Sequence, residues 1–253
     1  MPKPIQSIER AAAILRLLSG RRRLGVVDLS GELGLPKGTV HGILRTLHEV
    51  GFVEQDPESG KYQLGAALLH MGSSYLDGNE LRTRALNWSD ALAARSKESV
   101  RIGTLHEGQV LVVHHVFRPD DTFQALEVGA LLPAHATAMG KILLADHRYV
   151  AVALAEEGLA PITPATITDA DRLLAELAEV RERGWAVDVG ELMDGEASLA
   201  APIDDRRGVT MGAMSISGPV TRLFARGRPR EELVSHVRDA ARAVSRELGA
   251  IPW

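Results

Sequence analysis

The sequence predicts an α+β fold in two parts, a small helical region that ends in a β-hairpin and a larger α/β region. Two observations predict the first part: a helical apolar pattern over residues 37–50 and two short β-rich segments around a turn at 56–60. A third observation predicts the second part, because β-rich segments alternate with amphipathic ones from residue 100 onward. At 253 residues, the chain is long enough for two ordinary domains.

The helix predicted over residues 37–50 has a clear beginning and a clear end. Pro36 suits the start, where a missing N–H costs nothing, and Gly51 suits a left-handed cap after the last turn. Its apolar face consists of Val40, Leu44, Leu47 and Val50. The other face carries short polar or cationic groups, crowded toward the start of the helix: Lys37, Thr39, His41, Gly42 and Arg45. A helix that reads the DNA major groove needs this arrangement, because its first turns point at the bases.

The flanking segments complete a DNA-binding motif. Residues 25–33 predict a second short helix, which ends at Gly34 before a turn into the helix just described. The first helix covers residues 5–19, with a core stripe of Ile8, Ala11, Ala12, Leu15 and Leu18. Strands at 52–55 and 61–64 form a hairpin. This order of elements indicates a winged helix-turn-helix; a small helical bundle with an incidental hairpin is the alternative.

Composition excludes several classes of protein. Apolar residues make up 45% of the chain, which supports a sizeable core, and the lack of cysteine excludes disulfides and thiolate metal sites. No apolar run is long enough to span a bilayer, and the first residues lack the apolar core of a signal peptide. We therefore expect a soluble, cytoplasmic protein with no membrane partner.

The net charge of −4 is unevenly distributed. Residues 1–75 carry nine Lys and Arg against seven Asp and Glu, whereas residues 76–253 carry twenty against twenty-six. The basic groups of the first region form a modest footprint for DNA phosphates: Lys3, Arg10, Arg16, Arg21, Arg22, Arg23, Lys37, Arg45 and Lys61. One copy would bind DNA weakly, so we expect a dimer. The run at 21–23 is equally consistent with a solvated loop.

The rest of the chain is predicted as a linker helix at 66–76, a long helix at 80–96 and an α/β region. Predicted strands cover 100–105, 110–117, 123–128, 185–189, 198–202 and 209–217. Predicted helices begin near residue 137, run from an N-cap at Thr168 to Gly184, and cover 230–248. We accordingly divide the chain into a winged helix-turn-helix domain at 1–65, a linker helix at 66–78 and a third region at 79–253.

Several segments together resemble the IclR family of bacterial transcription regulators along nearly the whole chain. They are residues 5–10, 35–53, 60–65, 133–141, 183–188, 200–202 and 215–219. The resemblance implies that region 79–253 is an effector-binding α/β domain related to GAF folds. It also implies binding to double-stranded operator DNA as a homodimer or a dimer of dimers. The DNA-contacting residues expected for this chain are Ser7, Arg10, Lys37, Gly38, Thr39, His41, Gly42, Arg45 and Lys61.

Within the family, the chain is most similar to the branch that regulates glycerol operons in actinomycetes, through residues 37–47, 112–121 and 241–246. Most of the wider family has Ser or Thr in place of Gly38 and Arg in place of Gly42. The operator should therefore differ from those of other branches. The resemblance implies repression of a glycerol catabolic operon, with glycerol 3-phosphate or glycerol as effector. Control of another catabolic pathway through a small carboxylate is the alternative.

A small anionic or hydroxylated effector needs hydrogen-bond donors in a mostly apolar cup. The helix start at 137–139 can hold an anion, Asp188 can accept from a hydroxyl, and residues 215 and 217 face one side of a strand. The resemblance implies an effector site of Ala138, Met139, Asp188, Ser198, Ser215 and Ser217. The structural alternative is that Ser215 and Ser217 are ordinary polar residues of a strand and that Asp188 only caps a turn. A phosphate would need Arg101, Arg118 or Lys141 nearby; without one of them, a neutral or monocarboxylate effector is favoured.

Other chemistry is less well supported by the sequence. His114 and His115 point to opposite faces of a strand and cannot chelate one metal ion, so we expect no metal and no cofactor. His135 is expected to order the loop before its helix. A hydrolase that uses Ser198 or Ser215 with His135 and Asp188 is a remote alternative, since the sequence has no Gly-x-Ser-x-Gly elbow. A constitutive architectural DNA-binding protein would not need the long acidic second region.

Overall fold

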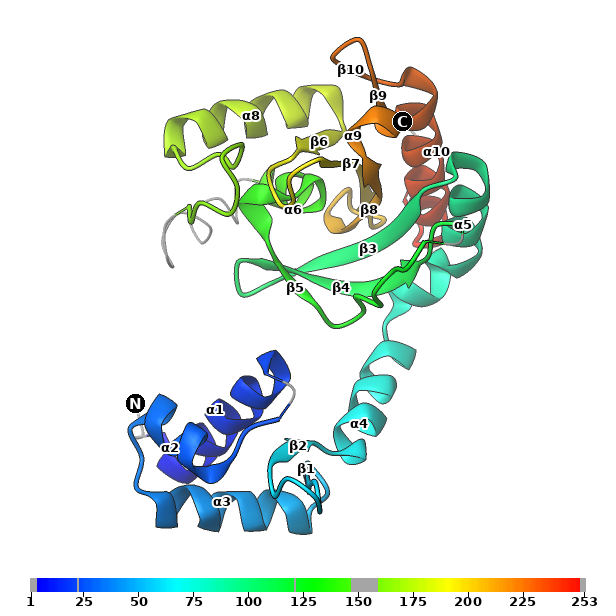
Figure 1. Cartoon of the computed structure of the whole chain (residues 1–253). Helices are drawn as coiled ribbons and strands as arrows, with labels where there is room; N and C mark the ends of the chain where they lie inside the picture. Colours follow the sequence, from blue (N-terminus) through cyan, green and yellow to red (C-terminus); the bar gives the residue numbers. More distant parts are fainter. Residues whose placement is uncertain (1–3, 22, 121, 147–158, 251–253) are drawn as a thin grey trace. The chain divides into compact units, whose positions relative to one another are not determined.

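The computed structural model describes residues 4–21, 23–120, 122–146 and 159–250. The chain forms two compact units, Met1–Gly78 and Asn79–Trp253, which are described separately below (Figure 1). Within the described residues, no helix is long and apolar enough to cross a membrane.

The first unit consists of three helices, a β-hairpin and a fourth helix. Its helices are α1 (Gln6–Gly20), α2 (Val26–Leu33), α3 (Lys37–Glu49) and α4 (Ala66–Asp77), and the hairpin pairs β1 (Val53–Gln55) with β2 (Tyr62–Leu64). Leu24 adds a bridge to the hairpin through two backbone hydrogen bonds with Tyr62. This is the winged helix-turn-helix expected from the sequence.

The core of the first unit lies between the three helices and the hairpin. Its fully buried members include Ile14, Leu29, Val40, Leu44 and Val53. Two residues assigned to apolar faces from the sequence are instead exposed: Ile8 is 64% exposed and Val50 is 53% exposed.

Both differences have a local cause. The core stripe of α1 passes through Ile14 and Leu18, which are one turn apart, and Ile8 near the helix start lies off that stripe. Val50 is the C-cap of α3, with φ −92° and ψ 4°, so its side chain leaves the helical face. Gly51 follows with φ +75°, in the left-handed conformation expected at this position.

The second unit is built on one antiparallel sheet of order β5-β4-β3-β8-β7-β6. The strands are β3 (Ser99–His106), β4 (Gln109–Val116), β5 (Leu131–Pro133), β6 (Ala186–Val189), β7 (Glu196–Asp204) and β8 (Thr210–Pro219). Helices α5 (Glu80–Ser96) and α10 (Glu231–Glu247) cover one face, and α6 (Ala138–Leu144) and α8 (Ala170–Arg183) lie on the other side (Figure 1). The short elements are η1 (Ala134–Ala136), α9 (Val220–Leu223), β9 (Phe224–Ala225) and β10 (Arg228–Pro229).

Three details of the second unit differ from the sequence prediction. Residues 123–128 form no strand: Phe123 is 96% exposed, and the Gln124 side chain closes the loop by bonding the backbone N–H and C=O of Arg118. The edge strand is instead β5, a few residues later. The cap of α8 is Asp169, whose carboxylate accepts the Arg172 N–H, so Thr168 is not the cap. The pair β9–β10 was not predicted.

Strand register places a set of polar side chains on one face of the sheet. Arg101 lies opposite Ser215, and Ser99 opposite Ser217. Ser217 in turn lies opposite Ser198, which lies opposite Asp188. Residues directly opposite each other share a face, so these groups lie together on the α6 side. The intervening residues, such as Val100 and Ile216, face α5 and α10.

Candidate functional site

The first candidate site is the exposed face of α3. Lys37, Gly38, His41 and Arg45 are exposed, and Thr39 and Gly42 are half-buried. The one ion pair on this face is Arg45 Nε to Glu49 Oε1 at 3.9 Å, among the residues that the structure describes. The helix therefore presents a cationic face whose side chains remain available to a partner.

The two glycines of α3 are not required by the fold. A Cβ added at Gly38 or at Gly42 would meet no atom within 4 Å, and both have ordinary helical φ values. Each glycine costs about 0.5–1 kcal/mol of helix stability relative to alanine. Their cost has no packing benefit here, so we interpret the flat surface they leave as a property of the contact face.

The other predicted DNA contacts surround this helix in the same unit. Ser7 is exposed near the start of α1, Arg10 is half-buried on the same helix, and Lys61 is exposed at the hairpin. The basic run at 21–23 behaves differently. Arg21 pairs with Glu32 at 2.6 Å, and Arg23 bonds Asp56 at 2.6 Å and Gln63 at 3.1 Å. These two arginines stabilise the unit itself, whereas Arg22 lies outside the described residues.

The second candidate site is a small cavity of about 180 Å³ on the α6 side of the sheet. Strands β3, β4, β6, β7 and β8 and the loops at 118–127 and 192–196 contribute to it. Most of the residues that line it are polar: Ser99, Arg101, His115, Arg118, Gln124, Glu127, Asp188, Glu196, Ser198 and Ser217, with Ala125, Leu192, Met193 and Ala197.

Asp188 is the deepest carboxyl group of this cavity. It is 5% exposed; its Oδ2 accepts a hydrogen bond from the Ser198 hydroxyl and, at 3.0 Å, one from the Ala138 backbone N–H. Burial raises the pKa of Asp188 to about 6, although both hydrogen bonds favour the charged form. Asp188 therefore loses its proton at a higher pH than an exposed aspartate does.

Two backbone amides at the start of α6 are bonded to the protein's own side chains. Asp188 accepts the Ala138 N–H, and the Thr137 hydroxyl oxygen accepts the Gly140 N–H at 3.0 Å. The Ala138 amide is thus not free for the effector anion that we expected at this helix start.

The six residues assigned to the effector site divide into two groups. Asp188, Ser198 and Ser217 line the cavity. Ala138, Met139 and Ser215 are at most 3% exposed and lie outside its lining, with the first two packed in the core between the sheet, α6 and α8. The Ser215 hydroxyl is buried without a hydrogen-bond partner among the described residues.

Of the three candidate cations, Arg101 and Arg118 line the cavity and Lys141 does not. Arg101 donates to the Ser217 hydroxyl and pairs with Glu127. Arg118 pairs with Asp120 and donates to Thr122 at 2.7 Å. Lys141 is 1% exposed and bonds Glu191 at 2.5 Å and the Val187 carbonyl at 3.1 Å. It anchors the loop that follows β6.

His115 is a member of the cavity that the sequence analysis missed. Its Nδ1 accepts the Glu127 backbone N–H at 3.3 Å, and burial lowers its pKa to about 4, so the ring is neutral at pH 7. The remaining proton is then on Nε2, which is buried without a partner among the described residues. The sequence alone does not show that β3 and β4 pair His115 with Arg101. This pairing puts both side chains on one face of the sheet.

His135 and Ser198, which the hydrolase alternative would use, bond to other groups. His135 is buried, with Nε2 3.0 Å from the Ala160 carbonyl, and Ser198 bonds Asp188 directly. The described part of the chain holds no group of three or more His, Cys, Asp or Glu side chains placed to bind a metal ion.

Comparison with known proteins covers both units. The family model described as IclR helix-turn-helix domain matches residues 7–57, and the model described as bacterial transcriptional regulator IclR C-terminal matches residues 73–246. Glycerol operon regulatory proteins from Streptomyces griseus and Streptomyces coelicolor are each 55% identical over 251 residues, which is 99% of this chain and of each relative. The crystal structure of an IclR transcriptional regulator from Alicyclobacillus acidocaldarius matches with a TM-score of 0.81 at 29% identity, over 98% of this chain and 100% of that one.

Proposed function

The chain belongs to the IclR family of bacterial transcriptional regulators, and we propose that it represses a glycerol catabolic operon, with glycerol 3-phosphate or glycerol as effector. The observation that carries this proposal is the 55% identity, over both units, to two glycerol operon regulatory proteins. Because the family consists of transcriptional regulators, the hydrolase alternative is set aside. We place the protein in the cytoplasm, where its operator DNA lies.

The cavity in the second unit supports a very small effector. Its volume of about 180 Å³ suits a three-carbon compound better than an aromatic or sugar-sized one. Asp188 can accept hydrogen bonds from ligand hydroxyls, and Ser198 and Ser217 can exchange their present partners for them.

A phosphate group on the effector would be held by different residues. Arg101 supplies a planar fork, and the unpartnered Nε2–H of His115 supplies one more donor. Arg101 is paired with Glu127 in the present structure, so a phosphate would compete with that carboxylate. Glycerol has no phosphate group and would not compete with that carboxylate. The same fork would accept a small carboxylate, which keeps regulation of another catabolic pathway as a second candidate.

The DNA-binding side of the proposal uses Lys37, Thr39, His41 and Arg45 in the major groove, with Gly38 and Gly42 allowing close approach. Ser7, Arg10 and Lys61 would contact the backbone. We infer a homodimer or a dimer of dimers on a two-fold operator. Helix α4 supports this inference, since it has no buried residue and exposes Leu69, Met71 and Tyr75.

As mechanism, we propose a population shift. The effector would favour one arrangement of the dimer over another, and the linker helix α4 would pass that preference to the spacing of the two recognition helices. The effector must bind the two arrangements with different affinity, since a ligand of equal affinity shifts nothing.

A gel-shift assay at fixed salt tests the proposal. The probes are the upstream region of the protein's own gene and that of the adjacent operon, with glycerol 3-phosphate, glycerol and a panel of small carboxylates as additions. Release of a specific complex by one of the two glycerol compounds supports both class and branch. A specific complex that only a carboxylate releases would favour the second candidate. No specific complex would overturn the proposal.

A further inference from the structure

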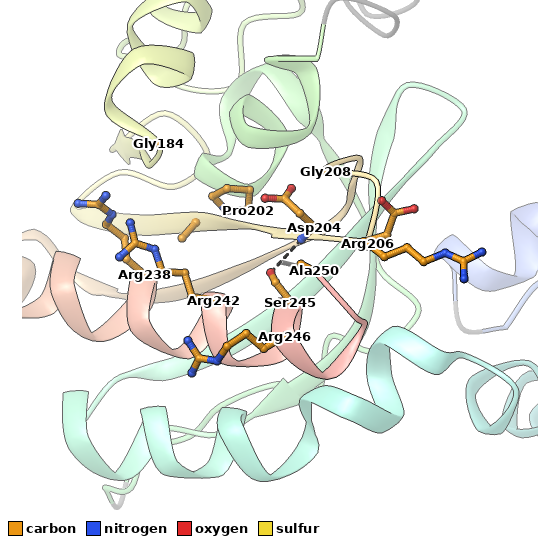
Figure 2. Close-up of a pocket in the computed structure, with 12 residues that line it drawn as sticks. Gly184, Pro202, Asp204, Arg206, Gly208, Arg238, Arg242, Ser245, Arg246 and Ala250 are labelled. Atoms are coloured by element: carbon orange, nitrogen blue, oxygen red, sulfur yellow. Dashed lines mark hydrogen bonds between the residues drawn. The ribbon is translucent and has the colours of Figure 1, made fainter. Parts of the chain in front are cut away.

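A second cavity of the second unit lies apart from the cavity lined by Asp188, Ser198 and Ser217, which we call the effector cavity. It measures about 480 Å³ and lies between α10, the end of β7, the turn at 205–208 and Gly184 after α8 (Figure 2). A neighbouring cavity of about 420 Å³ shares Arg238 and Arg242 with it and extends past Trp185 to β10. None of the residues lining these two cavities lines the effector cavity. We call the two together the α10 groove.

Five arginines and four carboxylates line the α10 groove, which leaves a small excess of positive charge. Arg238, Arg242 and Arg246 recur every four residues along α10 and therefore lie on one stripe of the helix. Figure 2 shows the guanidinium groups of Arg238 and Arg242 extending toward the same end of the cavity, near Gly184. Arg206 from the turn and Arg228 from β10 add positive charge at the two ends.

The three arginines of this stripe have no direct partner among the described residues. Within the described ranges, no hydrogen bond or ion pair joins their side chains to any other group. Like charges four residues apart destabilise a helix by about 0.2–0.5 kcal/mol per pair, so the row has a cost. It has no visible internal benefit to offset that cost.

The carboxylates of the groove are already bonded elsewhere or lie apart. Asp204 accepts from the Thr210 hydroxyl at 2.8 Å, and Asp205 accepts the N–H groups of Arg207 and Val209 at 2.8 and 3.0 Å. In the neighbouring cavity, Asp239 accepts from the Ser235 hydroxyl at 3.4 Å, and Glu231 lies in the first turn of α10. Among the described residues, none of these carboxylates forms an ion pair with Arg238 or Arg242.

We propose that the α10 groove binds a small organic phosphate, with the forks of Arg238 and Arg242 on its phosphoryl group. Two planar guanidinium groups that share one cavity match the geometry of phosphate oxygens, which accept paired N–H donors. The cavity volume is that of a small-molecule site. Ala201 and Pro202 on one side, and Pro229 and Val234 on the other, offer apolar surface to the organic part. This site is independent of the proposed effector.

Calorimetric titration of the full-length protein with inorganic pyrophosphate tests the site. The variant R238Q/R242Q removes both forks, and R172Q/R226Q, two exposed arginines outside the groove, removes the same total charge. We expect one pyrophosphate per chain, bound at least about tenfold more weakly by R238Q/R242Q and within about twofold of the unmodified protein by R172Q/R226Q. Thermal unfolding of each variant confirms that it is folded.

Two further variants locate the bound pyrophosphate and show what holds it. R101Q removes the fork of the effector cavity, where a phosphate group could also bind. Pyrophosphate binding that depends on Arg238 and Arg242 should persist in this variant. R238K/R242K keeps the charge without the fork and should bind with intermediate affinity. The proposal is overturned if pyrophosphate does not bind. It is equally overturned if R172Q/R226Q weakens binding as much as R238Q/R242Q, or if R101Q alone abolishes it.

Discussion

The two units hold their polar groups in opposite ways. In the first unit, Lys37, His41 and Arg45 lie on an exposed helix face and contribute little to the fold around them. In the second unit, Asp188 and Lys141 are almost fully buried, and each is bonded to other groups of the same unit. A side chain that contacts DNA can remain hydrated until DNA binds, so it needs no partner within the protein. A sensor for a small molecule must satisfy its polar groups internally until the ligand replaces some of those bonds.

The largest effect should come from breaking the buried pair of Lys141 and Glu191. Replacing Lys141 by Met leaves a buried carboxylate without its cation, and we expect the second unit to lose about 3–5 kcal/mol of stability in urea unfolding followed by circular dichroism. The matched control is K141M/E191M, which removes both charges and should recover most of the loss. If K141M alone were as stable as the unmodified protein, the interior would tolerate an unpaired charge.

The exposed Arg45 of α3 should show the reverse behaviour. Replacing Arg45 by Ala should change stability by less than about 0.5 kcal/mol, because the side chain is exposed and its pair with Glu49 is long. Its discrimination between operator and unrelated DNA should fall by about 1–3 kcal/mol in fluorescence anisotropy titrations. Equal weakening on both DNAs would instead make Arg45 a phosphate contact.

A pH titration tests the raised pKa of Asp188 in the effector cavity. Asp188 has a pKa of about 6 in the folded protein against its usual 3.8, so between these values the folded state binds more protons than the unfolded state. The unmodified protein should therefore gain about 1 kcal/mol of stability relative to D188N as pH falls from 7 to 5, and lose it again as pH rises through 6. A difference in urea unfolding that stays constant with pH would show that Asp188 is not buried as described.

The smallest effect should come from the hairpin. Lys61 is exposed, so its replacement by Ala should leave stability unchanged. The dependence of log K on log salt for DNA binding should become shallower by about one phosphate contact, for operator and unrelated DNA alike. An unaltered slope would remove Lys61 from the DNA-binding face.

Local sequence patterns predicted the first unit well, because its elements are short and end at recognisable residues. Gly34 and Gly51 take the left-handed conformation that a helix end favours, and the hairpin forms at the predicted turn. Prediction failed where packing between distant segments decides. Residues 123–128 form an apolar pattern that does not pair in the sheet, because β5 pairs with β4 instead.

The cavity shows the same limit in its chemistry. Asp188, Ser198 and Ser217 could be found from the sequence, because their positions match a family pattern. His115 and Glu127 could not, since their place depends on the pairing of β3 with β4 and on the loop after β4. Nor could the sequence show that Asp188 itself occupies the amide at the start of α6.

In the proposed mechanism, binding of a ligand to the second unit changes DNA binding by the first unit. Calorimetric titration of glycerol 3-phosphate into the full-length protein, alone and saturated with operator, measures this coupling directly. We expect operator DNA to weaken glycerol 3-phosphate binding by the same factor by which glycerol 3-phosphate weakens operator binding, because coupling between two sites is reciprocal. Binding of glycerol 3-phosphate with equal affinity in the presence and absence of operator would contradict it.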